Sequence, residues 1–199
     1  AGRFADAVTG FIGYTASKPT NPWGHYMLGL SAWKSGDLTM AETELARVVE
    51  LDSTHVKGWI NLGRVLLDEK RPAAALEAVD RAKEIDPKSP DVYRVLGRVE
   101  SDLGLPEKAV DAYRTAVSID DKDTWALNNL GLQLLELSRP EEALGPLARA
   151  VAVKPDVAVF HNNLGMALEH AGYFAAAADQ YTLAVGIDST HTRASANLG

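Results

Sequence analysis

Six leucine–glycine pairs recur along this chain at a constant spacing of 34 residues. They are Leu28-Gly29, Leu62-Gly63, Leu96-Gly97, Leu130-Gly131, Leu164-Gly165 and Leu198-Gly199. A strict period of this length is typical of arrays in which each repeat packs only on its neighbours. We therefore expect a stack of repeats, and the position of a residue within its repeat decides how it is interpreted.

The period predicts five complete repeats between two partial ones. The complete repeats are expected at residues 22–55, 56–89, 90–123, 124–157 and 158–191. Residues 1–21 form an expected half-repeat with one helix over roughly Arg3 to Ala16, and residues 192–199 open a further repeat. Because neighbouring repeats share a continuous core, we expect a single domain over residues 1–199.

Each complete repeat is predicted to contain two helices joined by a tight turn. In repeat 56–89 two apolar stripes follow the helical period, and their residues are Trp59, Leu62, Gly63 and Leu66, then Ala75, Val79, Ala82 and Ile85. Pro72 is expected to begin the second helix, where a missing N–H costs nothing because first-turn donors have no helical partner. Pro106 and Pro140 stand at the same place in later repeats.

The pattern Trp59-x-x-Leu62-Gly63-x-x-Leu66, followed by Ala75, Val79, Ala82 and Pro87, resembles a tetratricopeptide repeat. The resemblance covers nearly the whole chain. It implies an all-α fold, a right-handed superhelical solenoid of tandem helix-turn-helix repeats. It also implies that the first helices line a concave groove, which in this family usually binds extended peptides or partner segments.

Positions two, five, six, nine, twelve and thirteen of each first helix are expected to face this groove, because they lie away from the packed stripe. In repeat 22–55 they include three aromatic residues, Trp23, Tyr26 and Trp33. Exposed aromatic clusters usually mark interaction sites. The alternative is that the amino-terminal half-repeat folds over them.

Three arginines at groove positions of the next two repeats, Arg64, Arg94 and Arg98, are candidates for binding acidic residues. The alternative is that they form ion pairs within their own helices. Asp68 and Asp102 each follow an arginine by four residues, and Asp91 precedes Arg94 by three.

Asparagines occupy groove positions five or six in most repeats. They are Asn61, Asn128, Asn129, Asn162, Asn163 and Asn197. An amide both donates and accepts hydrogen bonds, so a row of amides can hold the backbone of an extended peptide. Related repeat arrays use such a row, and Trp125 is expected to face the groove beside it.

Composition and motifs argue against several other classes of function. The net charge of −7 disfavours binding to nucleic acid, and no apolar run is long enough to insert into a membrane. With no cysteine, no phosphate-binding glycine loop and no nucleophile motif, we expect neither catalysis nor a cofactor. The histidines are not spaced to bind a metal, and we expect His25 and His161 to be partly buried core residues.

The leading hypothesis is a noncatalytic scaffold that binds a peptide or partner segment, with acidic residues favoured in that partner. One alternative is the recognition arm of a larger enzyme, for example a glycosyltransferase. Another is a scaffold that self-associates through open terminal repeats, where Leu198 leaves an apolar edge. The sequence begins without a leader peptide, although one could have been removed upstream. We expect a cytoplasmic protein, with a periplasmic or exported one left open.

Overall fold

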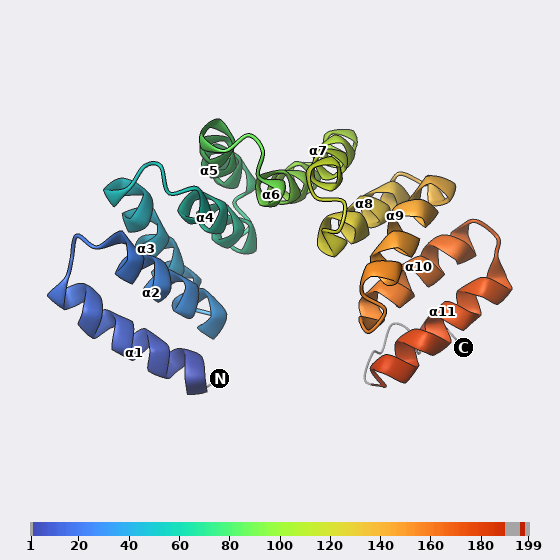
Figure 1. Ribbon diagram of the computed structural model, residues 1–199, viewed down its shortest axis with the longest axis horizontal. Coiled ribbons are helices and arrows are strands. Elements are labelled where there is room, and N and C mark those ends of the chain that lie inside the picture. The colour runs from blue at the N-terminus through green and yellow to red at the C-terminus, as the bar shows by residue number, and fades with distance from the viewer. Residues whose placement is uncertain (1, 190–195, 198–199) are drawn as a thin grey trace. The chain divides into compact units, whose positions relative to one another are not determined.

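The computed structural model describes residues 2–189 and 196–197 (Figure 1). These residues form helices and contain no strand, which confirms the predicted all-α repeat fold. The chain divides into two compact units, residues 1–103 and 104–199, and each unit is described by itself. The boundary falls inside repeat 90–123, between its two helices, so the single domain over residues 1–199 stays a prediction.

Unit 1 contains the helix of the half-repeat and five helices that follow it. They are α1 (Gly2–Ser17), α2 (Pro22–Ser35), α3 (Leu38–Leu51), α4 (Val56–Asp68), α5 (Pro72–Ile85) and α6 (Pro90–Asp102). Each helix packs on the next, and the first helices α2, α4 and α6 also contact one another in order. Residues on the first helix of one repeat can therefore contact residues on the first helix of the next.

In its described residues, unit 2 repeats this arrangement with five helices. They are α7 (Pro106–Ile119), α8 (Thr124–Glu136), α9 (Pro140–Val153), α10 (Ala158–His170) and α11 (Phe174–Ile187). Consecutive helices pack together, and the first helices α8 and α10 contact each other. Leu198 lies outside the described residues. Among those that are described, none of the helices has both the length and the apolar character needed to cross a bilayer.

In four of the leucine–glycine pairs the glycine allows a close approach between the two helices of its repeat, and these glycines are Gly29, Gly63, Gly131 and Gly165. A methyl group at Gly165 would lie 2.5 Å from Cε1 of Tyr181 on α11, and one at Gly63 would lie 2.8 Å from a methyl carbon of Val79 on α5. Such contacts are closer than carbon atoms tolerate. The side chain sixteen residues after the glycine therefore occupies the space that the glycine leaves.

The turns inside the repeats share one backbone conformation. Prolines begin α5, α7 and α9 at the predicted places. Just before the second helix, one residue has a positive φ in every repeat, and these residues are Gly36, Lys70, Gly104, Ser138 and Gly172. A positive φ is costly for residues other than glycine. The turn therefore keeps its geometry where the sequence departs from glycine.

His25 and His161 are buried as predicted, at 9% and 5% exposed. Nδ1 of His25 lies 2.6 Å from Oε2 of Glu44, and Nδ1 of His161 lies 2.8 Å from Oε1 of Gln180. In both, Nε2 lies 3.0 Å from the carbonyl oxygen of a proline six residues earlier. The two histidines therefore join the helices of their repeats through polar contacts.

Candidate functional site

The predicted groove positions of the first helices form what we call the first-helix face of each unit. In both units, neighbouring first helices are joined there by hydrogen bonds between residues 35 apart. Asn61 on α4 donates to the Tyr26 hydroxyl on α2 at 2.9 Å, and Asn163 on α10 donates to Oδ1 of Asn128 on α8 at 2.8 Å. Position five of one repeat thus binds position six of the next.

Trp23 is the most exposed aromatic residue of this face in unit 1, at 51% exposed. Its ring meets the edges of Phe11 and Tyr14 on α1, with centroids 5.8 and 5.4 Å apart. The half-repeat helix therefore supports one side of the indole, as the alternative prediction expected, while half of its surface stays open.

Tyr26 and Trp33 use their polar atoms between repeats. The Tyr26 ring lies 5.1 Å from that of His55, and burial raises the pKa of its hydroxyl above the usual value while the bond from Asn61 opposes the shift. Trp33 donates from Nε1 to Asp68 on α4 at 2.8 Å. These two aromatic side chains are half-buried and connect α2 to α4.

The three predicted arginines form ion pairs with two aspartates. Arg98 on α6 donates to Asp68 on α4 at 2.7 Å, so one carboxylate joins three successive first helices. Arg64 lies 3.3 Å from Asp91 on α6, and Arg94 also binds Asp91. The prediction of an Asp91–Arg94 pair is confirmed.

The predicted pairing of Arg64 with Asp68 and of Arg98 with Asp102 is wrong, because each arginine donates to an aspartate on the neighbouring first helix. Helical spacing considers only one helix, whereas packed first helices bring closer partners. Arg64 also donates to Oδ1 of Asn61 at 3.1 Å. Burial, with a smaller effect from nearby Arg94, lowers the pKa of Arg64.

The asparagines of unit 2 bind one another. Asn128, Asn162 and Asn163 are 3%, 1% and 6% exposed. Asn162 donates to Oδ1 of Asn163 at 3.2 Å and accepts from Asn197 at 3.2 Å. Asn129, which is half-buried, accepts from Asn128 at 3.4 Å. The amides predicted to hold a peptide backbone therefore form a chain of hydrogen bonds inside the unit.

Trp125 is the open aromatic residue of the first-helix face in unit 2. It is 47% exposed, and its ring meets the edge of buried Phe160 on α10 with centroids 5.1 Å apart. Trp23 and Trp125 both stand at position two of their repeats. Each unit thus presents one half-exposed indole whose other side rests on an aromatic ring of a neighbouring helix.

The hydrogen bonds between residues 35 apart were missed from the sequence, although a signal was available. Repeats 124–157 and 158–191 each carry two consecutive asparagines, at positions five and six. A pair of adjacent amides that recurs with the period offers a donor and an acceptor to both neighbours. This pattern indicates bonds between repeats at least as well as bonds to a ligand.

Comparisons with known proteins agree with this architecture. Family models described as tetratricopeptide repeat match residues 26–90 and 128–192, and another of the same description matches residues 90–123. No curated protein matches the chain.

Solved structures of repeat proteins are similar in fold. The structure of YrrB, described as a TPR protein with an unusual peptide-binding site, is 20% identical with a TM-score of 0.67, over 94% of this chain and 96% of that one. TTC0263, a thermophilic TPR protein of Thermus thermophilus, is 19% identical with a TM-score of 0.77, over 89% and 99%. PilF of Pseudomonas aeruginosa is 19% identical with a TM-score of 0.78, over 87% and 79%. At these identities the likeness concerns the fold.

Proposed function

Because the chain belongs to the tetratricopeptide repeat family, we propose that it is a noncatalytic protein-interaction scaffold. Its first-helix face binds extended segments of a partner protein. The observation that carries this proposal is the half-exposed indole at position two in each unit, Trp23 and Trp125. Tryptophan is enriched among residues that dominate binding energy, and a ring fixed on one side loses little entropy when a ligand covers the other.

In unit 1 the partner segment carries acidic residues. Asp91 is 47% exposed and lies 3.3 Å from Arg64, so water already competes for this ion pair. A carboxylate of the ligand replaces Asp91 at the partly buried Arg64 and Arg94, so that both guanidinium groups stay paired. Arg98, at 43% exposed, offers a further donor.

In unit 2 the partner contacts Trp125 and the half-buried Asn129. We propose a structural role for Asn128, Asn162 and Asn163, because a ligand reaches them only by breaking their mutual hydrogen bonds in a buried place. We assign them to the spacing of α8 and α10. Asn61 has the same role in unit 1, through Tyr26.

The test begins with peptides selected against the purified protein from a displayed random library. Their affinities are then measured by calorimetry for Trp23→Ser and Trp125→Ser variants. Tyr173→Ser is the matched control, since Tyr173 is 57% exposed but lies outside the first-helix face. Loss of about tenfold or more in a tryptophan variant, with no loss in the control, supports the proposal. If the peptide affinity is the same in all three variants as in the unaltered protein, the proposal is ruled out.

A second candidate, self-association, is favoured by helix α11. Leu183 is 48% exposed there, at the position where Arg81 and Arg149 stand in other repeats. Ile187, four residues later on the same face of α11, is 41% exposed. We propose that a second copy covers this apolar surface. Light scattering should then show concentration-dependent dimers that Leu183→Arg abolishes, and a monomer at all concentrations contradicts this candidate.

A further inference from the structure

A groove lies between the second helices α3 and α5 of unit 1, with α4 as its floor. We call it the α3–α5 groove. Its volume is about 540 Å³, within the range of about 300–1,000 Å³ that is usual for ligand sites. The floor is apolar and consists of Trp59, Leu62 and Leu66, which lie at the packed positions of α4 and not on the first-helix face. Ala46 on α3 and Ala74 on α5 line the walls.

The rim of the α3–α5 groove is acidic. Arg71 binds Glu42 across the groove at 2.7 Å and Glu69 at 2.8 Å, and hydrogen bonds to these carboxylates raise its pKa. The other lining arginine is paired with a glutamate of its own helix. In the part of the chain that the structure describes, the remaining lining carboxylates, Glu77 and Asp80, form no ion pair.

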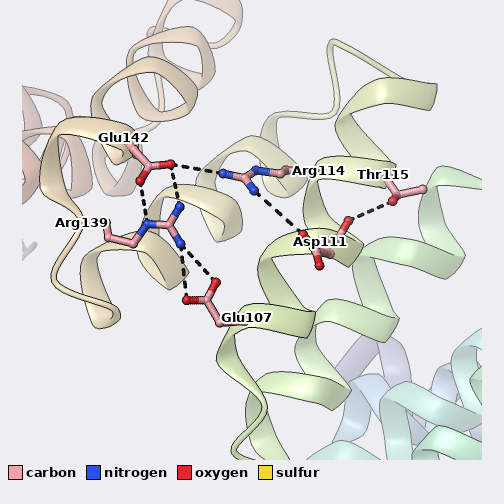
Figure 2. Close-up of polar contacts among 6 residues, drawn as sticks. All are labelled: Glu107, Asp111, Arg114, Thr115, Arg139 and Glu142. Atoms are coloured by element: carbon pink, nitrogen blue, oxygen red, sulfur yellow. Dashed lines mark hydrogen bonds and ion pairs between the residues drawn. The ribbon is translucent and has the colours of Figure 1, made fainter.

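Ion pairs bridge the corresponding place in unit 2, between α7 and α9. Arg114 on α7 binds Glu142 on α9 at 3.2 Å, as Figure 2 shows. Arg139 binds the same glutamate at 2.6 Å and Glu107 at 3.1 Å, which adds a second connection across the helices (Figure 2). These ion pairs connect α7 to α9.

The sequence explains the difference between the two places. Arg114 and Glu142 stand two repeats after Ala46 and Ala74. The two alanines therefore leave open the space that an ion pair bridges in unit 2. The floor also differs, because Trp59 is half-buried whereas its counterpart Leu127 is only 2% exposed.

We propose that the α3–α5 groove is a second binding site, for a short peptide segment with bulky apolar side chains next to lysine or arginine. The apolar side chains lie on Trp59 and Leu62 between the two alanines. The cations bind Glu77 and Asp80, while their aliphatic stems cover the apolar floor and a guanidinium stacks on the indole. The acidic rim repels an acidic segment, so this site prefers the opposite charge from the one proposed for the arginines of the first-helix face.

The experiment uses the full chain and a fluorescein-labelled peptide, Gly-Lys-Leu-Arg-Phe-Lys-Gly. One control peptide has glutamate in place of the basic residues, and another has serine in place of leucine and phenylalanine. Anisotropy should show binding of the first peptide only. Equal binding of the glutamate peptide, or no binding of the basic peptide to the unaltered protein, overturns the proposal.

Variants then locate the site. Ala46→Arg combined with Ala74→Glu transfers the ion pair of unit 2 into the groove and should abolish binding. Glu77→Lys should weaken binding by about tenfold or more, whereas Asp179→Lys, at the same repeat position in unit 2, should leave it unchanged. Circular dichroism melting confirms that the variants fold.

Unchanged affinity in the folded double variant, or equal losses for Glu77→Lys and Asp179→Lys, contradicts the proposal. The Trp23→Ser and Trp125→Ser variants should keep full affinity for the basic peptide. Failure of this site and failure of the first-helix face are therefore separate results.

Discussion

Unit 1 and unit 2 solve the same packing problem with different side chains. Both join neighbouring first helices through residues 35 apart, as Tyr26 with Asn61 and Asn128 with Asn163 show. In unit 2 the contacts are buried amides. In unit 1 charged groups are added, and Asp91 is nearly half exposed. One repeat geometry therefore supports either a buried polar contact or a partly exposed charged one.

The largest effect should come from the buried amides. Asn163→Ala leaves the buried Oδ1 of Asn128 without its donor, so we expect a loss of about 1–3 kcal/mol in unfolding free energy. Asn61→Ala is the counterpart in unit 1, and its loss should be smaller because Tyr26 is half-buried and regains water. Urea unfolding measures both. Equal losses in unfolding free energy for the two variants would contradict the claim that the contact in unit 2 is the more buried one.

A smaller effect is expected from the charged contacts of unit 1. Trp33→Phe removes the donor to Asp68 but keeps the Arg98 partner, so the expected loss is about 0.5–1.5 kcal/mol. Added salt should weaken the remaining Arg98–Asp68 ion pair, because exposed charges are screened. The unfolding free energy of the variant should therefore fall further at high salt. Unfolding at low and high salt checks this. If the unfolding free energy of Trp33→Phe depends on salt no more than that of Asn163→Ala, the description of unit 1 is contradicted.

Alkaline pH should act on both units through tyrosine. Burial raises the pKa of Tyr26 and of Tyr181, and Tyr181 also donates to Glu169 at 2.7 Å. The neutral phenols therefore stabilise the fold fully below their unfolded pKa of about 10, and this contribution is lost as pH rises through the folded values.

Tyr181→Phe should remove part of this alkaline loss, and Tyr26→Phe a smaller part, since Tyr26 is less buried. Unfolding free energies measured on both sides of pH 10 report the difference. Identical pH profiles for the unaltered protein and both variants would show that neither phenol carries the effect.

The smallest effect concerns the turns. Lys70 in unit 1 and Ser138 in unit 2 have φ values of 62° and 57° where other repeats carry glycine. Replacing either by glycine relieves the conformational cost of about 1 kcal/mol, partly offset by the entropy of the unfolded chain. Each variant should therefore melt slightly higher. A lower melting temperature for both shows that their side chains stabilise the turn by other contacts.

The fold was predictable because one spacing fixes it. Leu130-Gly131 and its equivalents require helices that pack at the same place in each repeat, and the helix bounds follow closely. The exposed indoles were predictable in the same way, from position two. The burial of Asn163 and its bond to Asn128 were not predictable. Helical periodicity gives the direction of a side chain on one helix, but it does not give the partner of that side chain on the next helix.

The α3–α5 groove was also beyond prediction. Ala46 and Ala74 are ordinary small residues in the sequence. Their importance appears only where the structure places Arg114 and Glu142 at the corresponding positions. A groove forms where small residues on two neighbouring helices leave space between them. The sequence pattern of a single helix does not show which residues face each other across that space.

The central claim is that the asparagines hold repeats together while the indoles face the partner. The most direct measurement is NMR hydrogen exchange of the Asn163 side-chain amide, before and after addition of a selected peptide, with the Trp125 indole resonance followed in the same samples. We expect slow amide exchange in both states and a shifted indole resonance on binding. Fast exchange in the free protein, or an indole that does not respond to the peptide, would contradict it.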